Sequence, residues 1–433
     1  MQTPKYIIRQ EYLDFLIRSM NKPIIKVVSG VRRSGKSTLF LLFRNYLLNN
    51  SVSPKQIINI NFEDYANDNL RNAKKLHDTI VKRLIPNKKN YVFLDEIQHV
   101  KDFERVVDSL YIRKNIDLYL TGSNAYFLSG ELATLLSGRY MELKILPLSF
   151  KEFVAWHKDA SHYIDVASFG HARTTYGAPL TSLVNKQNKI NLSNKELFEK
   201  YTKSSFPFTL FTDTDAERLD YLQGIFSTVV LNDIVQRAGI QDVRNLERLL
   251  ETLFSSIGTL VTVNKLKDTM VSKQIQITNA TIDKYLKAIL DSMIMYEAKR
   301  YDIHGRQLLD TQEKYYVVDT GLRNLLLRDH LEDFGHMLEN IVFLELLRRG
   351  NKVYIGRNQK YEVDFVAINA KQEVSYYQVA LSTLDENVLS RELRSLQTIN
   401  DNFPKTLITM DEINREANYE GIQKVNLLDW LLT

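Results

Sequence analysis

The first 150 residues alternate short apolar runs with longer segments whose apolar residues recur at helical spacing. The apolar runs that predict strands are residues 24–29, 57–61, 91–95, 116–121 and 141–146. The helices between them are expected to begin near Lys36, Asn69, Phe103 and Leu128. Strands that alternate with helices form a parallel sheet covered on both faces, so this pattern predicts an α/β fold.

A capping box marks the point where the chain leaves this sheet. Ser149 is a good helix N-cap and Glu152 follows three residues later, so we expect a helix over residues 150–158. Residues 159–194 are polar and rich in Gly, Ser, Thr and Asn, which predicts a long loop or insertion. Helical periodicity returns over residues 195–240.

Residues 241–300 have the order of a winged-helix module. The expected helices are residues 245–256, a helix that opens at 262–266, and residues 282–292; the strands of a wing are residues 293–299 and 314–318. The third helix carries Lys284 and Lys287 as its exposed cations, which is a sparse footprint for nucleic acid. A structural lid without nucleic acid therefore remains an equal alternative.

The last hundred residues are expected to form a further small α/β unit. A helix over residues 334–349 ends at Gly350, a typical C′ position. The expected strands are residues 353–355, 362–368, 374–380 and 406–409, with a helix over 390–399. The pattern returns from helical spacing to short apolar runs, so this part is expected to be built on a sheet of its own.

Composition narrows the choice of function only slightly. The 433 residues include 57 Lys and Arg, 52 Asp and Glu and no Cys, which gives a net charge of +5 and excludes disulfides and thiolate zinc sites. The excess of positive charge is too small to establish nucleic-acid binding. No apolar run is long enough to span a membrane and no secretory signal is visible, so a cytoplasmic location is expected.

The segment Gly30-Val31-Arg32-Arg33-Ser34-Gly35-Lys36-Ser37 has the pattern G-x-x-x-x-G-K-[ST] of a phosphate-binding loop. A strand leads into it and a helix leaves it, so backbone N–H groups and the helix dipole would attract an anion. Lys36 would reach the β- and γ-phosphates of a nucleotide, and Ser37 would bind Mg²⁺. The expected nucleotide-binding residues are Gly30, Arg32, Arg33, Ser34, Gly35, Lys36, Ser37 and Thr38.

Two other strand ends supply candidate catalytic groups. Asp95 and Glu96 follow the strand over 91–95, where Asp95 would hold Mg²⁺ and Glu96 would act as general base toward water. Asn124 follows the next strand and would orient that water or sense the γ-phosphate. Ligands bind at the carboxyl ends of strands in open α/β sheets, which favours these roles over ordinary turn positions.

These motifs resemble those of prokaryotic AAA-type P-loop ATPases that carry a C-terminal winged helix and a restriction-endonuclease-like domain of unknown function. The resemblance is carried by GVRRSGKST at 30–38, FLDEIQ at 93–98, LTGSN at 120–124, LLSGRY at 135–140, LPLSFKEF at 146–153, YYVVDTGLRN at 315–324 and GHMLENIVFLELLRRG at 335–350. It implies an ATPase core at 1–155, an insertion and helical linker at 156–240, a winged-helix-like module at 241–330 and a degenerate nuclease-like domain at 331–433.

The resemblance also implies roles for two arginines. Arg139 occupies the position of an arginine that could act as a finger on the transferring phosphoryl group, often from a neighbouring subunit of a homo-oligomer. The alternative is a surface arginine that pairs with Glu142. Arg32 matches an arginine inside the phosphate loop, where either a phosphate contact or a salt bridge to Asp95 or Glu96 would explain it.

The nuclease-like domain departs from the pattern that cleavage requires. Glu339 and Asp364 match the helix and first-strand carboxylates, but Gln378 replaces the second acidic ligand and Ala380 replaces the lysine that would activate water. Lys371 on the adjacent hairpin could substitute for that lysine in principle, but nothing in the sequence supports this role. Metal-dependent cleavage is therefore not expected from this domain.

The sequence thus predicts Mg²⁺-dependent binding and hydrolysis of ATP that drives or gates a conformational change. Three biological roles for this ATP binding and hydrolysis remain open. One is a DNA-associated ATPase that contacts double-stranded DNA, and another is a nucleotide-gated scaffold for a protein partner. The third is an ATP-gated nuclease, which the missing ligands disfavour. No membrane partner is expected.

Overall fold

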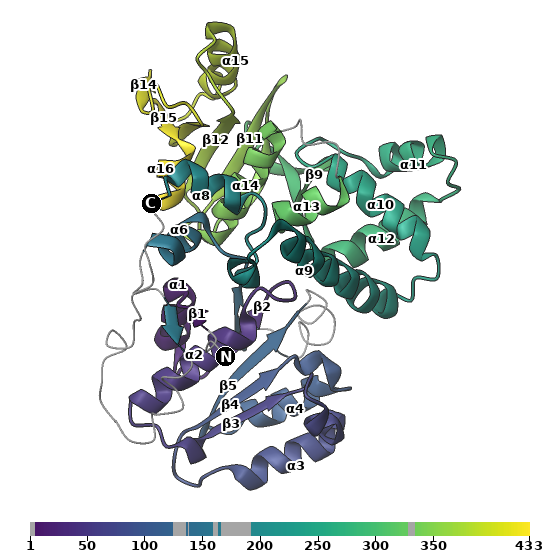
Figure 1. The fold of residues 1–433 in the computed structure, drawn as a ribbon, viewed down its shortest axis with the longest axis vertical. Coiled ribbons are helices and arrows are strands. Elements are labelled where there is room, and N and C mark those ends of the chain that lie inside the picture. Colours follow the sequence, from purple (N-terminus) through teal and green to yellow (C-terminus); the bar gives the residue numbers. More distant parts are fainter. Residues whose placement is uncertain (1–4, 124–135, 137, 159–162, 166–191, 328–333) are drawn as a thin grey trace. The chain divides into compact units, whose positions relative to one another are not determined.

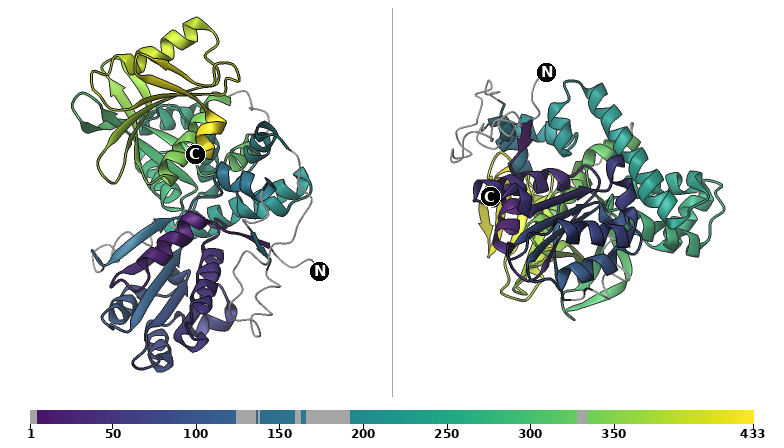
Figure 2. Two further views of the ribbon diagram at one scale, coloured as in Figure 1. Left: turned by 90° about the vertical axis from the view of Figure 1, so that its left-hand side faces the viewer. Right: turned by 90° about the horizontal axis from the view of Figure 1, so that it is seen from below.

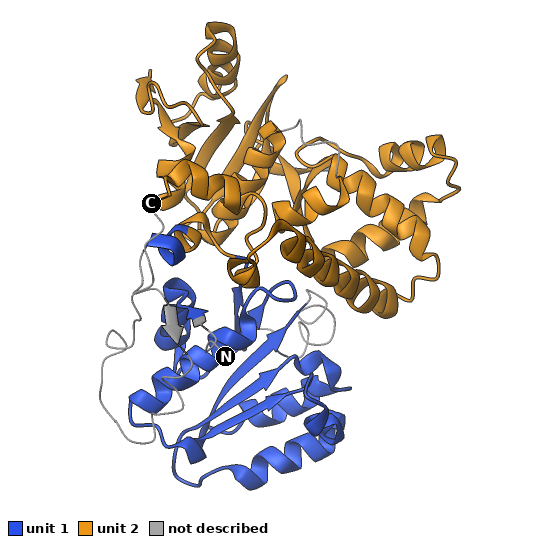
Figure 3. Ribbon diagram, viewed as in Figure 1, with its two compact units in different colours: residues 1–147, 154–191, 291–293 blue, residues 148–153, 192–290, 294–433 orange. Residues whose placement is uncertain are grey.

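The computed structural model covers the 433-residue chain and describes all of it except residues 1–4, 124–135, 137, 159–162, 166–191 and 328–333. The chain forms two compact units, which Figure 3 shows in different colours. Unit 1 comprises residues 1–147, 154–191 and 291–293, and unit 2 comprises residues 148–153, 192–290 and 294–433. No helix in the described ranges is both long enough and apolar enough to cross a bilayer.

Unit 1 is built on a five-stranded parallel sheet (Figure 1). Its strands are β2 (Ile25–Ser29), β3 (Ile57–Asn61), β4 (Asn90–Asp95), β5 (Ile116–Gly122) and β6 (Tyr140–Lys144). They lie in the order β3-β4-β5-β2-β6, and each neighbouring pair is parallel. All five carboxyl ends therefore lie along one edge of the sheet, with β5 between β2 and β4.

Helices pack on the sheet of unit 1 and are seen from two further directions in Figure 2. They are α1 (Gln10–Ser19), α2 (Lys36–Asn49), α3 (Ala73–Arg83) and α4 (Phe103–Tyr111). Shorter elements are η1 (Pro54–Gln56), η2 (Tyr65–Arg71), η3 (Ile97–His99) and the antiparallel pair β1 (Lys5–Ile7) and β7 (Tyr163–Asp165).

Side chains of the strands alternate between two apolar cores, one on each face of the sheet. On one face Leu94 packs with Ile80 of α3 and Val107 of α4. On the other face Phe93 packs with Phe40 of α2, in an edge-to-face contact with ring centroids 5.2 Å apart. Because both faces are buried, the strands read in the sequence as continuous apolar runs.

The α/β fold with a parallel sheet that the sequence predicts is confirmed, and each strand lies within two residues of its predicted bounds. One helix differs: α3 begins at Ala73, because residues 65–71 form the 3-10 helix η2 and Asn72 then caps α3 by accepting from Lys75 N–H. The helix expected near Leu128 lies outside the described residues.

Unit 2 begins with a helical region. Its helices are the start of α6 (Phe150–Lys158), α8 (Asn194–Tyr201), η7 (Pro207–Phe211), α9 (Asp215–Thr228), the π-helical η8 (Val229–Gln236), α10 (Val243–Ser255), α11 (Val263–Ser272) and α12 (Asn279–Asp291). The three helices α10, α11 and α12 are followed by the hairpin of β8 (Met295–Asp302) and β9 (Gln307–Val317). This is the order of helices and strands that the sequence predicts for residues 241–318.

The rest of unit 2 continues the same sheet. Its elements are α13 (Thr320–Leu326), α14 (Phe334–Arg348), β10 (Lys352–Asn358), β11 (Tyr361–Ile368), β12 (Val374–Ala380), α15 (Glu386–Gln397), β13 (Lys405–Thr409), β14 (Ala417–Tyr419), β15 (Ile422–Asn426) and α16 (Leu427–Leu432). The eight strands have the order β14-β15-β13-β12-β11-β10-β8-β9. Because β8 pairs with β10 as well as with β9, one sheet contains strands that the sequence analysis divides between two domains.

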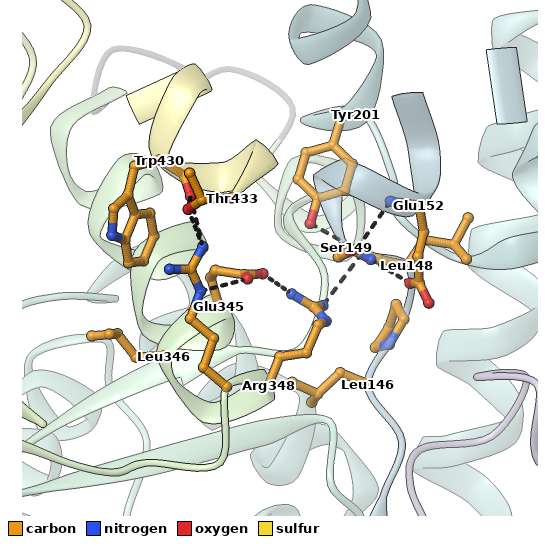
Figure 4. A network of polar contacts seen from close by, with 12 residues as sticks. Leu146, Leu148, Ser149, Glu152, Tyr201, Glu345, Leu346, Arg348, Trp430 and Thr433 are labelled. Atoms are coloured by element: carbon orange, nitrogen blue, oxygen red, sulfur yellow. Dashed lines mark hydrogen bonds and ion pairs between the residues drawn. The ribbon is translucent and has the colours of Figure 1, made fainter. Parts of the chain in front are cut away.

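A short segment just after unit 1 in the chain is bound into unit 2 (Figure 4). The carbonyl of Leu148 accepts hydrogen bonds from Tyr201 Oη at 3.0 Å and from Arg348 of α14 at 3.4 Å. Ser149 and Glu152 form the expected capping box of α6, with reciprocal hydrogen bonds of 2.8 and 3.0 Å. Residues 148–153 are thus anchored by side chains of α8 and α14.

Candidate functional site

The loop between β2 and α2 has a backbone that its two glycines make possible. Gly30 has a φ of +153°, and a Cβ there would lie 2.2 Å from the carbonyl oxygen of Ile145. Gly35 has a φ of +101° and precedes the first residue of α2. Any side chain at Gly30 would displace the neighbouring backbone, so the loop follows its path only with glycine at this position.

Lys36 is buried at the start of α2, and its side chain turns back over the loop. Its Nζ donates to the carbonyl oxygens of Gly30 at 2.9 Å and Val31 at 3.2 Å. The same atom lies 3.4 Å from Oε1 of Glu96. The ammonium is therefore held between the loop and the end of β4, beside the N–H groups of α2 that lack intrahelical partners.

Asp95 ends β4 and is 5% exposed. Burial raises the pKa of its carboxyl group, while hydrogen bonds from Thr121 and Ser37 oppose that rise. Thr121 donates to Asp95 Oδ1 from β5, and the Ser37 hydroxyl reaches the same carboxylate from the start of α2. The two residues expected to hold Mg²⁺, Ser37 and Asp95, are thus in hydrogen-bond contact.

Glu96 is buried and has a left-handed backbone with a φ of +55°. Its N–H donates to Thr121 Oγ1 at 2.8 Å, and Gln98 Nε2 donates to its carboxylate at 2.5 Å. Burial by itself would raise the pKa of Glu96, but Lys36, with help from Gln98 and Arg32, lowers it to about 2. The carboxylate is therefore ionised at neutral pH, as a general base must be.

Arg32 forms a salt bridge that the sequence analysis does not anticipate. Its guanidinium donates to Glu63 at 2.6 Å and also acts electrostatically on Glu96. Glu63 follows β3, and its carboxylate lies within 4.8 Å of ligand atoms of Glu96 and His99. These three side chains are close enough together to hold a cation.

Arg9 approaches the loop from the residue before α1. The side chain is 4% exposed and donates to the carbonyl oxygens of Ser34 at 3.1 Å, Leu146 at 2.8 Å and Pro147 at 3.2 Å. Its guanidinium also lies 4.5 Å from the ring centroid of Tyr12. One buried cation therefore joins the phosphate loop to the segment that follows β6.

The two remaining candidate catalytic residues lie apart from this group or outside the described residues. Arg139 is bound to α4, where its guanidinium donates to Asp108 at 2.5 Å and lies 5.7 Å from the ring of Tyr111. Its partner is thus Asp108, and the expected surface pair with Glu142 is wrong, because the Glu142 carboxylate accepts from Ser29. Asn124 lies outside the described residues.

The residues around the loop fit a nucleotide with Mg²⁺. Ser34 Oγ is fully buried within the loop and has no hydrogen-bond partner in the described part of the chain, so a polar group is needed beside it. Lys36 and the N-terminus of α2 suit a phosphate, and the oxygens of Ser37 and Asp95 are the ligand type that Mg²⁺ prefers.

Several residues at the site were missed from the sequence. Thr121 contacts both acidic residues, Gln98 contacts Glu96 and Ser123, and Arg9 contacts the loop. Thr121 and Gln98 lie inside the motifs LTGSN and FLDEIQ, so their positions carried a signal. Arg9 lies 25 residues before Ser34 and belongs to no motif.

In unit 2 the structure brings Glu339 of α14 and Asp364 of β11 into electrostatic contact. Gln378 donates to Glu392 at 2.9 Å and accepts from Asp364 N–H at 3.3 Å. The lysine beside Glu339 is Lys314 of β9, at 3.3 Å, whereas Lys371 is exposed on the turn before β12. The hairpin β8–β9 thus brings to Glu339 a lysine that the sequence analysis does not consider.

Two family models and several proteins are similar to this chain. A family model described as an AAA domain matches residues 22–154, and one described as a domain of unknown function matches residues 194–333. An uncharacterized protein of Haemophilus influenzae is 38% identical over 427 residues, which cover 98% of each chain. An uncharacterized protein of Methanocaldococcus jannaschii is 29% identical over 419 residues, which cover 94% of this chain and 85% of that protein.

Among solved structures, the Walker-type ATPase PABY2304 of Pyrococcus abyssi has 16% sequence identity and a TM-score of 0.48, and covers 74% of this chain and 96% of its own. The fold and site define a P-loop nucleotide-binding protein of the AAA class. The chain belongs to an AAA-type ATPase family and to the same family as the uncharacterized Haemophilus influenzae protein.

Proposed function

We propose that the protein binds ATP with Mg²⁺ in unit 1 and hydrolyses it, and that the nucleotide gates a conformational change in a DNA-associated role. The hydrolytic part rests on one observation: Lys36 Nζ from the loop lies 3.4 Å from Glu96 Oε1 at the end of β4. Lys36 and the loop N–H groups would bind the phosphates, and Ser37 and Asp95 would hold Mg²⁺. Mg²⁺ would neutralise charge on the phosphate oxygens, and Glu96 would accept a proton from the attacking water.

Arg9 supports the part of the proposal that concerns a conformational change. It contacts Ser34 inside the loop and the two carbonyl oxygens of Leu146 and Pro147. If nucleotide binding moves the loop, Arg9 would therefore transmit the movement to Leu146 and Pro147, which lead out of unit 1. Residues 148–153, which follow directly, are anchored in unit 2 through Leu148.

The order of elements in residues 243–317 supports the DNA-associated role. Three helices precede a hairpin, as in a winged-helix module, and α12 would be the recognition helix. Lys284 and Lys287 are exposed on α12, one turn apart, and Arg306 is exposed at the tip of the hairpin. These cations would contact phosphates, so the affinity for DNA would fall as salt is added.

A cavity in the same module favours the alternative of a nucleotide-gated scaffold for a protein partner. It has a volume of about 560 Å³ and lies between α10, α11 and α12. Its lining includes Tyr285 and Ile277, together with Val271, whose side chain is 51% exposed. An open pocket that combines these groups with polar ones such as Asp242 and Thr281 could accept a side chain of another protein.

The experiment that separates these roles is ATP hydrolysis by the full chain with and without double-stranded DNA. A DNA-associated ATPase should be stimulated several-fold by DNA. Replacing Lys284→Gln together with Lys287→Gln should weaken DNA binding and reduce the salt slope by about 2. The matched control, Lys75→Gln with Lys82→Gln on α3 of unit 1, removes the same charge and should leave DNA binding unchanged.

Hydrolysis that does not respond to DNA, in a protein that binds none at low salt, would reject the DNA-associated role. It would leave ATP hydrolysis in unit 1 standing and favour the scaffold. A protein that neither binds nor hydrolyses ATP would reject the first part of the proposal as well.

A further inference from the structure

Lys314 lies buried among carboxylates where β9, β11 and α14 meet. Its side chain is 4% exposed, and its Nζ lies 2.9 Å from Glu362 Oε1 and 3.3 Å from Glu339 Oε2. Asp364 also acts electrostatically on the ammonium. Tyr316 Oη donates to Glu339 at 3.5 Å from the same strand as Lys314. This group of residues is called the carboxylate cluster below.

The cluster includes the two carboxylates, Glu339 and Asp364, that match the metal ligands of a restriction-endonuclease-like fold. The position of the remaining acidic ligand is occupied by Gln378, which forms hydrogen bonds within the domain. Gln378 accepts from Asp364 N–H and donates to Glu392, while Val379 N–H donates to Asp364 Oδ2 at 2.8 Å. Gln378 and one oxygen of Asp364 are therefore engaged in bonds that hold the sheet and α15 together.

Access to the cluster is restricted by the turn after α10. A Cβ on Gly258 would lie 3.2 Å from Glu339 Oε2 and 2.6 Å from Cδ2 of His336. Gly258 itself is buried and has a φ of +70°. The backbone of this turn thus lies directly against the carboxylate that would have to bind a metal ion.

The cluster already contains a buried cation of its own, the ammonium of Lys314. Burial disfavours the ammonium of Lys314, but Glu339, Asp364 and Glu362 raise its pKa above the ordinary value, so it is charged. Burial and the neighbouring Glu339 raise the pKa of Asp364 well above its usual range, whereas Lys314 opposes that rise. One ammonium thus lies beside both Glu339 and Glu362, of which Glu362 is partly exposed to water.

We propose that the ammonium of Lys314 is the resident cation of this carboxylate cluster. The nuclease-like site is then not a metal centre. Its lysine forms ion pairs that hold the β8–β9 hairpin against α14 and β11. The cluster keeps the ligand chemistry of a divalent-cation site, but the lysine occupies the position that the cation would need. Removing the ammonium without changing the carboxylates should therefore create a site for a divalent cation.

The test uses the full chain, without nucleotide, and Mn²⁺ as the probe in calorimetry and electron paramagnetic resonance. Lys314→Met removes the charge and keeps most of the side-chain volume. Lys299→Met is the matched control, because Lys299 lies on β8, is 47% exposed and is 3.8 Å from Glu297. The wild-type chain is the reference for any Mn²⁺ bound in unit 1.

We expect Lys314→Met to bind one more Mn²⁺ per chain than the wild type and than Lys299→Met, and to lose it again when Glu339→Gln is added. We also expect its urea midpoint to fall without Mn²⁺ and to recover when Mn²⁺ is added. If Lys314→Met and Lys299→Met bind equal amounts of Mn²⁺ and unfold at the same midpoint, the proposal is wrong.

A second variant keeps the proposal testable if Lys314→Met does not fold. Glu339→Gln in the otherwise unchanged chain should leave the Mn²⁺ stoichiometry of the wild type as it is. A loss of one bound Mn²⁺ per chain in Glu339→Gln would show that the wild-type cluster already binds metal, and would overturn the proposal.

Discussion

Lys36 Nζ lies 3.4 Å from Glu96 Oε1, and this ion pair joins the phosphate loop to the end of β4. The pair is buried, with side chains 4% and 7% exposed. Burial disfavours the carboxylate of Glu96, but Lys36 stabilises it and the pKa falls to about 2. Glu96 thus acts as the counter-ion of Lys36, and the phosphates of ATP would compete with it for the same ammonium.

This competition predicts two opposite effects of Glu96→Gln. Hydrolysis should fall by about 10²–10⁴, because the amide cannot accept a proton from water. ATP should bind more tightly than to the wild type, because Lys36 loses its anionic partner. Steady-state hydrolysis and titration with a fluorescent ATP analogue measure the two effects separately.

Glu63→Gln is the control for Glu96→Gln. Glu63 is 49% exposed and pairs with Arg32, so this change removes a carboxylate from the same region without touching Lys36. It should alter hydrolysis far less than Glu96→Gln. Turnover by Glu96→Gln at the wild-type rate would refute the role of Glu96 as general base.

Replacing Arg9 should weaken both the fold and the affinity for nucleotide. Arg9→Met leaves the carbonyl oxygens of Ser34, Leu146 and Pro147 without their donor, so we expect a loss of about 2–4 kcal/mol in the free energy of unfolding. Urea unfolding measures the first effect and titration with the ATP analogue the second. Arg18→Met, an exposed position on α1, is the control and should change neither. If Arg9→Met binds ATP with unchanged affinity, Arg9 does not support nucleotide binding by the loop.

A buried ion pair between β2 and β5 should matter far more than an exposed one. Lys26 is fully buried and donates to Asp117, which also accepts from Tyr119 Oη at 2.8 Å. Asp117→Asn would leave the Lys26 ammonium without a counter-ion and should cost about 3–5 kcal/mol of unfolding free energy. Asp108→Asn, which breaks the exposed pair with Arg139, should cost about 0–1 kcal/mol. Equal urea midpoints for the two variants would contradict this.

The parts of the fold that the sequence predicts are those encoded by neighbouring residues. The phosphate loop is contiguous from Gly30 to Ser37, and each strand of unit 1 is an apolar run bounded by turns. The capping box of Ser149 and Glu152 spans four residues and forms as expected. In each case the deciding interactions lie within one or two turns of chain, so the local pattern contains them.

The parts that the sequence analysis misses depend on contacts between distant residues. Arg9 binds Leu146 across 137 positions, and Lys314 binds Glu339 across 25. The pairing of β8 with β10 merges two expected domains into one sheet, and no residue near Arg300 signals it. Such contacts are set by the topology of the sheet, which a single sequence does not specify.

The pair Glu297 and Glu313 predicts a pH dependence of stability. Burial, and after it the nearby Glu313, raises the pKa of Glu297 from 4.5 to about 7, although the cation of Lys299 lies 3.8 Å away and opposes this rise. The other groups around the pair are Tyr315, which donates a hydrogen bond to Glu313, and Asp283, which acts electrostatically on Tyr315. The folded state then binds more protons than the unfolded state between about pH 4.5 and 7. Stability should therefore fall as pH rises through this window and stay low above it.

Glu297→Gln should remove that dependence, because the amide does not titrate. At pH 8 the variant should melt about 2–6 °C above the wild type, and the difference should shrink toward pH 5. Thermal unfolding followed by circular dichroism measures it, with Glu247→Gln on the exposed face of α10 as control. A difference in melting temperature that is the same at pH 5 and pH 8 would contradict the titration of Glu297.

The exposure of Arg139 allows a test of whether it acts on a neighbouring subunit. Its side chain is 44% exposed. Among the described residues, its guanidinium contacts only two side chains of α4, an ion-pair partner in Asp108 and the ring of Tyr111. If it stabilises the transition state in trans, hydrolysis per subunit should rise with protein concentration, and Arg139→Ala should flatten that profile with a loss of roughly tenfold or more. Arg113→Ala, at an exposed position just after α4, should keep the rise. A wild-type profile that is flat across the range in which sedimentation shows assembly would exclude a finger in trans.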